Sequence, residues 1–289
     1  MTLKRSDIVQ IPFPSTGTWV MNDLRDKVIF ITGSTRGIGR EIALRCARDG
    51  AKVVITGKTV APHDRLPGTI YSVAEEVVQA GGQSLPVELD VRDEQAIETA
   101  VAQTVDRFGG IDVLVNNASA ISLTGTLATS AKKLDLMWQV NMRATFLMSQ
   151  ACIPHLIKAA RPHILTLSPP LNMQARWFAP HLAYTISKYG MSMCTLGLAQ
   201  EFATISVNCL WPRTTIATAA IRYNFPAGIL NASRHPAIVA DAAYQILTGG
   251  GASGNFYIDE EVLREAGVSD FGQYAVSPAT PLFDDLFLE

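Results

Sequence analysis

Short runs of apolar, often β-branched residues alternate along the chain with longer amphipathic stretches. Most of the short runs are apolar at nearly every position, which is typical of strands that helices cover on both faces. From residue 24 onward the pattern therefore predicts an α/β fold, in which a parallel sheet of about seven strands carries helices on both faces. The predicted strands are 27–32, 52–56, 85–89, 111–115, 163–167, 205–210 and 255–258.

Amphipathic stretches between these runs predict the helices. Several of them end in glycine, which readily adopts the left-handed conformation that terminates a helix, and Pro236 suits a first helical turn. No linker or internal repeat interrupts the pattern, so residues 24–289 are expected to form one domain. The predicted helices are 38–49, 71–80, 93–107, 130–159, 181–203 and 236–247.

Four segments lie outside this regular alternation. Residues 1–23 lack the uninterrupted apolar core of a secretory signal and are expected to form a surface arm. Residues 58–70 carry two prolines and make a long connection, which predicts a surface insertion. Residues 213–233 form a lid region whose apolar residues either line a pocket or pack on the core or on another subunit. The tail 270–289 mixes apolar and acidic residues and is expected to pack along the domain or along a partner subunit.

Composition excludes several classes of partner. The 289 residues include 24 Lys and Arg against 26 Asp and Glu without a long block of one sign, so neither nucleic acid nor a membrane surface is expected as a partner. No apolar run reaches the roughly 18 residues that span a bilayer. The four cysteines lie far apart in apolar stretches without metal-ligand spacing, which favours reduced thiols, no bound metal and a cytoplasmic location.

A glycine-rich loop follows the first predicted strand and opens the first predicted helix, where residues 32–39 read TGSTRGIG. Glycines allow the backbone to approach a phosphate closely, and the amides and dipole of a helix start stabilise its negative charge. The spacing differs from the G-x-G-x-x-G fingerprint, and by itself it is also compatible with a structural turn. The candidate phosphate-binding residues are Gly33, Ser34, Thr35, Arg36, Gly37, Ile38 and Gly39.

Charges near the end of the second strand indicate which dinucleotide would bind. A free ribose 2′-hydroxyl is usually met by an acidic side chain about 20 residues after the loop, whereas a 2′-phosphate needs a cation. Here Lys58 follows the second strand, no acid appears before Asp64, and Arg36 lies in the glycine loop. NADP is therefore favoured, with NAD still open. The alternative is that Arg36 and Lys58 are both solvated surface residues.

Four motifs follow one another in the order and places that mark one protein family. They are TGSTRGIG after the first strand, Asn116-Asn117-Ala118-Ser119 after the fourth, Asn141, and Tyr184-x-x-x-Lys188 in a predicted helix. Each motif alone is weak evidence, but all four occur in the expected order and at the expected places relative to the predicted strands and helices. From residue 24 to about 259 the chain resembles the short-chain dehydrogenase/reductase family, which implies a single-domain, Rossmann-type, doubly wound sheet. Stretches such as NCLWPRTTIAT narrow the resemblance to the hydroxysteroid dehydrogenase-like subgroup, without the sterol-carrier domain that can follow there.

The resemblance implies a catalytic site at the carboxyl ends of the fourth to sixth strands, where ligands bind in open α/β sheets. Tyr184 would exchange a proton with the substrate oxygen, and Lys188, one helical turn away, would lower the pKa of the phenol and hold the nicotinamide ribose. Ser168 would hydrogen-bond the substrate oxygen, and Asn141 would position a water that links Lys188 to solvent. Cofactor contacts are further implied for Asp90, Val91, Asn117 and either Thr215 or Thr218.

Two positions depart from the family pattern. Pro169 stands where a second serine often follows Ser168, and the segment between Ser168 and Tyr184 is lengthened. Arg213 stands where a glycine usually follows the proline after the sixth strand, so this loop must run differently. Without the other motifs, the Tyr-x-x-x-Lys pair would indicate a surface contact and Ser168 a strand-end cap.

These features favour an NADP-dependent oxidoreductase that interconverts an apolar alcohol and its aldehyde or ketone. The alternative is a cofactor-binding regulatory or scaffold protein of the same fold, which the two departures would favour. By resemblance, a homodimer or homotetramer is expected, formed through helices within 93–159 and the last strand. Few charged residues occur in the loops expected to wall the substrate pocket, for which the candidates are Ile121, Leu123, Met173, Trp177, Phe178, Ile221, Tyr223 and Phe225.

Overall fold

Seven strands form one parallel sheet in the part of the chain that the structure describes. The computed structural model describes residues 23–64, 66–249 and 251–288, so the predicted N-terminal arm lies outside it except for Asp23. The strand order is β3-β2-β1-β4-β5-β6-β7, and the chain therefore winds outward in both directions from β1, as in a doubly wound sheet. All the predicted strands are confirmed, as β1 (Val28–Ile31), β2 (Lys52–Gly57), β3 (Gln83–Glu88), β4 (Val113–Asn116), β5 (His163–Thr166), β6 (Ser206–Trp211) and β7 (Phe256–Ile258).

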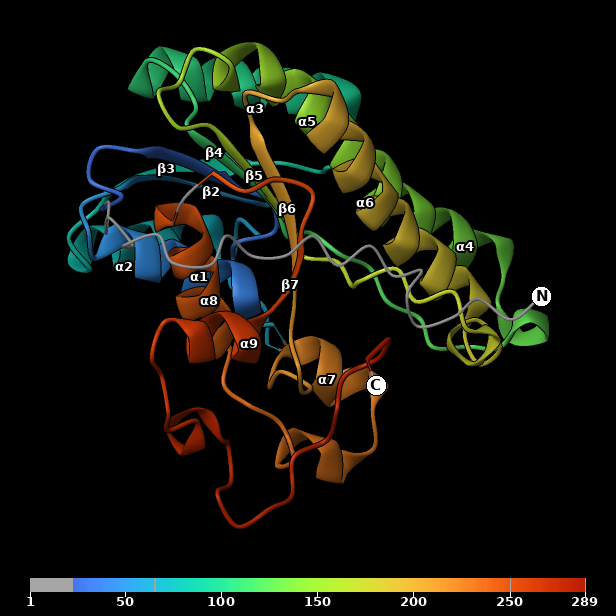
Figure 1. Cartoon of the computed structure of the whole chain (residues 1–289). Coiled ribbons are helices and arrows are strands. Elements are labelled where there is room, and N and C mark those ends of the chain that lie inside the picture. The colour runs from blue at the N-terminus through green and yellow to red at the C-terminus, as the bar shows by residue number, and fades with distance from the viewer. Residues whose placement is uncertain (1–22, 65, 250, 289) are drawn as a thin grey trace.

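Successive side chains of β1 enter two different cores on opposite faces of the sheet. Ile29 and Ile31 belong to one apolar cluster and Phe30 to the other, and all three are fully buried. Burying each such side chain contributes about 1.5–3 kcal/mol. The first cluster is covered by α1 (Gly37–Ala47), α2 (Ile70–Gln79), α8 (Ala237–Thr248) and α9 (Asp259–Glu265), and the second by α3 (Glu94–Phe108), α5 (Ala144–Leu156) and α6 (Leu182–Glu201) (Figure 1).

The stretch 130–159 is not the single helix that its pattern predicts. Helix α4 (Ala131–Met137) and α5 are joined by a π-helical segment, Trp138–Arg143, in which the turn is wider. Such segments are rare and frequently lie at functional sites. The buried residue of this segment is Asn141, one of the predicted catalytic residues. The break in the helix therefore places that side chain in the interior, next to α6.

The lid region and the tail pack together at the carboxyl edge of the sheet (Figure 1). The lid region contains the short helix α7 (Ala219–Asn224), and β7 leads directly into α9, which the sequence pattern did not predict. Three acidic residues in the first turn of α9 stabilise its start by opposing the helix dipole. Thr215 N donates to Phe283 O at 2.9 Å, and Asp285 N donates to Arg213 O at 3.0 Å. The tail thus packs along its own domain.

Candidate active site

The glycine loop between β1 and α1 has the backbone that a phosphate cradle needs. Gly33 and Gly37 have φ values of +65° and +57°, a region that residues with a side chain rarely adopt. Asn117, which follows β4, donates through Nδ2 to Thr32 O and Gly33 O at 2.8 and 3.1 Å. Asn117 therefore braces the loop.

Helix α1 presents an uncapped start to this loop. Its N-cap residue Arg36 is extended, no side chain caps the helix, and its first turn contains no acid. The first amides and the dipole of such a helix attract a phosphate. Ser34 and Thr35 are buried, and Ser34 Oγ donates to Ile31 O and accepts from Thr56 N, so this hydroxyl fixes the loop to the sheet. The residues present fit the diphosphate of a dinucleotide.

The insertion 58–70 and α1 hold the loop in place. Arg36 donates to two backbone carbonyl oxygens of the insertion. A Cβ at Gly39 would lie 2.4 Å from Asn117 Nδ2, so only glycine fits there. Ile38 packs against the first apolar cluster. Contacts within the protein therefore hold the glycine loop in this conformation.

Positive charges gather where the adenosine ribose would bind. Arg36 Nη2 donates to Thr59 Oγ1 at 2.8 Å, which places the guanidinium beside the residue that follows Lys58. Lys58 Nζ lies 3.4 Å from Asp90 Oδ2. Hydrogen bonds from Arg92 hold the pKa of Asp90 well below its usual range, so this carboxylate is ionised and already paired. At this end of β2 and β3 the structure places Arg36, Lys58, Asp90 and the buried Val91.

Tyr184 and Lys188 lie one turn apart on α6, and both are buried. Lys188 Nζ donates to Leu167 O at 2.6 Å and lies 5.1 Å from the centre of the Trp211 ring. Burial lowers the pKa of Lys188 to about 7. Burial, and then the charge of Asp285, raise the pKa of Tyr184. The raised pKa of this phenol follows from its burial, and the prediction that Lys188 lowers it stays a prediction.

Asn141 connects three parts of the site. Its Oδ1 accepts from Ala120 N at 2.7 Å, and its Nδ2 donates to Ala120 O and to Ser187 Oγ, both at 2.9 Å. These bonds tie the π-helical segment to the loop after β4 and to the residue that precedes Lys188 on α6. The role of Asn141 in holding a water toward Lys188 stays a prediction.

Ser168 follows β5, as expected, and is fully buried. Its Oγ lies 3.1 Å from Cys209 Sγ of β6, and this thiol is also 3.1 Å from Thr195 Oγ1 of α6. Burial raises the pKa of Cys209 to about 11, so the thiol is protonated at neutral pH. Ser168 thus faces a buried thiol, and its hydrogen bond to a substrate oxygen stays a prediction.

The two threonines considered for the cofactor lie in different surroundings. Thr215 is buried, and its Oγ1 lies 2.8 Å from Ser233 Oγ. Thr218 instead approaches the glycine loop, since a Cβ at Gly37 would lie 3.3 Å from its Cγ2. Thr218 therefore lies near the glycine loop, whereas the hydroxyl of Thr215 holds the lid region. A cofactor contact by either threonine stays a prediction.

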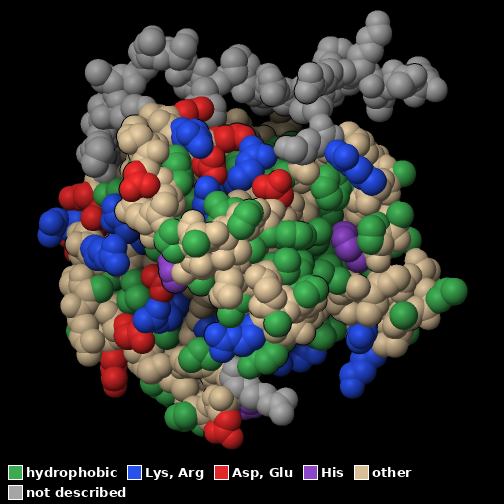
Figure 2. Space-filling model, turned by 90° about the horizontal axis from the view of Figure 1, so that it is seen from below, with side chains coloured by type: hydrophobic (Ala, Val, Ile, Leu, Met, Phe, Trp, Pro, Cys, Tyr) green, Lys and Arg blue, Asp and Glu red, His purple; other side chains and the backbone are tan. Residues whose placement is uncertain are grey.

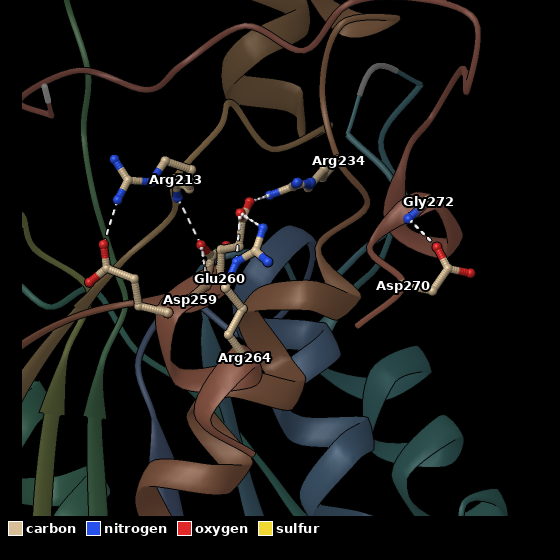
Figure 3. A network of polar contacts seen from close by, with 8 residues as sticks. Arg213, Arg234, Asp259, Glu260, Arg264, Asp270 and Gly272 are labelled. Carbon is tan, nitrogen blue, oxygen red and sulfur yellow. Dashed lines mark hydrogen bonds and ion pairs between the residues drawn. The ribbon is translucent and has the colours of Figure 1, made fainter. Parts of the chain in front are cut away.

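Arg213 takes part in a polar network at the start of α9 (Figure 3). Its backbone N donates to Asp259 Oδ1 at 2.8 Å, and its guanidinium pairs with Glu261. Glu260, which follows Asp259 on α9, pairs with Arg234, the residue directly after the lid region. These contacts fix the loop after β6 without a glycine, and its difference from the usual loop of the family stays a prediction.

A third apolar cluster, which includes Tyr184, lies at the carboxyl edge of the sheet. The sequence pattern did not predict that Trp211 and Phe287 would join it, although the apolar residues that follow two acids at 283–288 (FDDLFL) could have indicated burial of Phe287. Of the predicted pocket walls, Met173 and Tyr223 are 63% and 54% exposed and lie outside the cluster, as do Ile221 and Phe225. The cluster comprises Met137, Tyr184, Tyr189, Trp211, Ile258 and Phe287, with Ile121, Leu123, Trp177 and Phe178 packed against it.

Two further findings concern residues 23–64, 66–249 and 251–288. None of the helices in these ranges is long and apolar enough to cross a membrane. The same residues contain no group of three or more His, Cys, Asp or Glu side chains that could hold a metal ion.

Comparison with known proteins decides the family. The family model described as short chain dehydrogenase matches residues 27–225. The chain belongs to the short-chain dehydrogenase family. It is 56% identical over 263 residues to hydroxysteroid dehydrogenase-like protein 2 of Danio rerio, and the match covers 90% of this chain and 63% of that relative. The chain thus spans less than two thirds of the length of that relative.

Solved structures of this family share the fold. A Xanthomonas campestris protein described as a dehydrogenase is 52% identical, with a TM-score of 0.89 over 93% of this chain and 100% of that chain. The NADH-dependent reductase A1-R′ in complex with NAD is 25% identical, with a TM-score of 0.66 over 81% of this chain and 95% of that one. The Rossmann-type sheet is confirmed, and the family is one of oxidoreductases that use NAD or NADP.

Proposed function

We propose that this short-chain dehydrogenase is an NADP-dependent oxidoreductase that interconverts an apolar alcohol and its aldehyde or ketone, with Tyr184 as general acid and base. The observation that carries the proposal is the burial of Tyr184 and Lys188, one turn apart, beside an apolar cluster at the carboxyl edge of the sheet. A phenol in such surroundings can exchange a proton with the oxygen of an apolar molecule bound next to it.

Hydride transfer and proton transfer would be carried out by different groups of the site. A bound nicotinamide supplies the hydride in reduction and accepts it in oxidation. Tyr184 Oη gives its proton to the carbonyl oxygen in the first direction and takes one from the alcohol in the second. The raised pKa of Tyr184 keeps the phenol protonated at neutral pH, which favours reduction. Lys188, whose pKa of about 7 allows both charge states, can carry a proton to or from the site.

The charges at the ends of β2 and β3 support NADP over NAD. Changing Lys58→Glu places a carboxylate where a 2′-phosphate would bind, so the Kd for NADPH should rise about tenfold, since hydrogen bonds to charged groups contribute about 1.5–3 kcal/mol. The Kd for NADH should stay within about twofold. Fluorescence titration measures both, and Lys132→Glu, an exposed lysine of α4, is the control. Equal weakening of NADPH and NADH would contradict the NADP proposal.

The apolar cluster beside Tyr184 supports an apolar substrate. Oxidation of NADPH, followed by its absorbance, should be faster with medium-chain, terpenoid or aromatic aldehydes than with glyoxylate, by at least about tenfold in kcat/KM. A preference for the short, charged aldehyde would contradict this substrate class. Steroid ketones belong in the same panel because they test how large an apolar group the site accepts.

One observation favours a second function, a cofactor-binding regulatory or scaffold protein with little turnover. In this structure Tyr184 is 5% exposed and Phe287 packs against its ring. The two functions predict different outcomes of one pair of measurements. If NADPH raises the melting temperature and no carbonyl compound in the panel accelerates its oxidation, the regulatory function is supported and the enzyme is not.

Exposed apolar side chains support the homodimer or homotetramer that we propose as the assembly. On α5, Phe146 is 48% exposed, and on α6, Met193 and Leu196 are 53% and 43% exposed. Apolar surface of this kind on neighbouring helices is typical of subunit contacts. The cytoplasmic location also remains a proposal, with which the four free cysteines are compatible.

A further inference from the structure

The side chain of Phe287 fills the space beside Tyr184. It is 1% exposed, although it belongs to a tail that joins the site from the far end of the chain. The rings around it have centroid distances of 6.0 Å for Trp177, 6.0 Å for His181, 6.2 Å for Tyr184, 5.3 Å for Tyr189 and 5.9 Å for Trp211. Phe287 therefore occupies an aromatic box that includes the proposed acid/base.

Hydrogen bonds brace the walls of this box. The wall side chains themselves are uncharged, and the amine of Lys188 lies 5.1 Å from the centre of the Trp211 ring. Thr185 Oγ1 donates to Trp177 O at 2.6 Å, so His181 Nδ1, at 3.0 Å from the same hydroxyl, is its donor. Burial lowers the pKa of His181, which favours the neutral ring at neutral pH. Tyr189 Oη donates to Asn172 O at 2.6 Å. His181 Nδ1, Tyr189 Oη and Trp211 Nε1 thus bond to the protein, whereas Trp177 Nε1 is buried without a hydrogen-bond partner among the residues that the structure describes. The flat faces of the rings are left for an apolar group.

Two features oppose the present position of the tail. Phe287 has a φ of +75°, a left-handed conformation that is strained for residues other than glycine. Asp285 is buried, and burial raises its pKa to about 7. Hydrogen bonds such as that from Trp211 Nε1 to Leu286 O, at 2.9 Å, hold the tail in this position. A ligand that displaced the tail would relieve the strain and rehydrate the carboxyl group.

We propose that the space filled by Phe287 is the apolar subsite of the substrate, and that a substrate displaces Phe287 from it. The proposal deepens the proposed function and rests on it, because Tyr184 is one wall of the box. The size and planarity of the present occupant define the substrate class, namely aldehydes, ketones or alcohols that carry a phenyl-sized, flat apolar group within a few bonds of the oxygen-bearing carbon. Figure 2 shows apolar side chains gathered in the middle of the face seen from below, which includes the lid region and the tail.

Binding of 3-phenylpropanol tests the subsite, because an alcohol cannot react with reduced cofactor. Calorimetric titration in the presence of NADPH should give a Kd about tenfold lower for Phe287→Ala than for the wild type, since the internal competitor is gone. Phe283→Ala is the matched control, because Phe283 lies in the same tail and is 45% exposed. Propanol, which lacks the ring, should bind equally to all three proteins. Equal Kd values of 3-phenylpropanol for the wild type and Phe287→Ala would overturn the proposal.

Displacement can be measured in the wild-type protein, which also covers the case that Phe287→Ala does not fold. Hydrogen exchange of peptides from 276–289 should become at least about tenfold faster when 3-phenylpropanol is saturating, because the backbone bonds of the tail open. Unchanged or slower exchange would mean that Phe287 stays in the box, and the proposal would be wrong. Faster exchange without NADPH oxidation by any aldehyde would support the subsite and remove only the redox function.

Discussion

At the scale of single residues, burial decides the acid/base properties of the site. The i, i+4 spacing of Tyr184 and Lys188 is visible in the sequence and correctly places both on one face of α6. The direction of the pKa shift of Tyr184 could not be predicted from that spacing, because it depends on burial by a tail that is distant in sequence. The different surroundings of Thr215 and Thr218 could not be predicted either, because they depend on contacts with residues that are distant in sequence.

A test at this scale concerns Asn141, whose amide is fully buried and makes three hydrogen bonds. Asn141→Ala leaves the backbone N and O of Ala120 and the hydroxyl of Ser187 without these partners. Ser187 Oγ keeps its bond to Tyr184 O, so two backbone groups are left unsatisfied. Because each unsatisfied buried polar group costs about 1–3 kcal/mol, the free energy of unfolding should fall by about 2–6 kcal/mol. Urea denaturation measures it. Asn224→Ala, at an exposed site on α7, is the control and should change stability by less than about 0.5 kcal/mol.

At the scale of elements, the strands were predictable and the irregular connections were not. Each strand of a doubly covered parallel sheet is apolar at nearly every position, so its sequence is distinct. The π-helical segment Trp138–Arg143 inserts no proline or glycine, and its apolar pattern continues from α4 into α5, so the sequence contained no sign of the break. The sequence analysis missed the start of α9 at Asp259. Three consecutive acidic residues are common in loops as well as in the first turn of a helix, so they did not distinguish the two.

A prediction at this scale concerns the tail and the dependence of protein stability on pH. Asp285 is buried near Lys188 and Asp259, and its pKa is raised from 3.8 to about 7. The folded protein therefore binds more protons than the unfolded chain between these pH values, and its stability falls as pH rises through that window. Asp285→Asn removes this effect, so its melting temperature relative to the wild type should be higher at pH 8 than at pH 5. A difference that is the same at both pH values would contradict the buried position of the tail.

At the scale of the whole molecule, the family and the topology agree, and the assembly is the next property to test. Met193→Asp places a charge on the exposed apolar surface of α6 and should dissociate the proposed homo-oligomer, because burying an unpaired carboxylate costs several kcal/mol. Size-exclusion chromatography with light scattering measures the mass. Leu127→Asp, at a fully exposed residue that belongs to neither α5 nor α6, should leave the mass unchanged. Identical masses for wild type and Met193→Asp would remove α6 from the interface.

The central claim is that the Tyr184 phenol exchanges the proton that accompanies hydride transfer. Oxidation of NADPH by 3-phenylpropanal, measured for the wild type and for Tyr184→Phe at equal cofactor saturation, tests it most directly. The account predicts that kcat falls by about two to four orders of magnitude while the Kd for NADPH stays within about twofold. Tyr71→Phe, on the exposed side of α2, should behave as the wild type. Equal kcat values for the wild type and Tyr184→Phe would contradict the account.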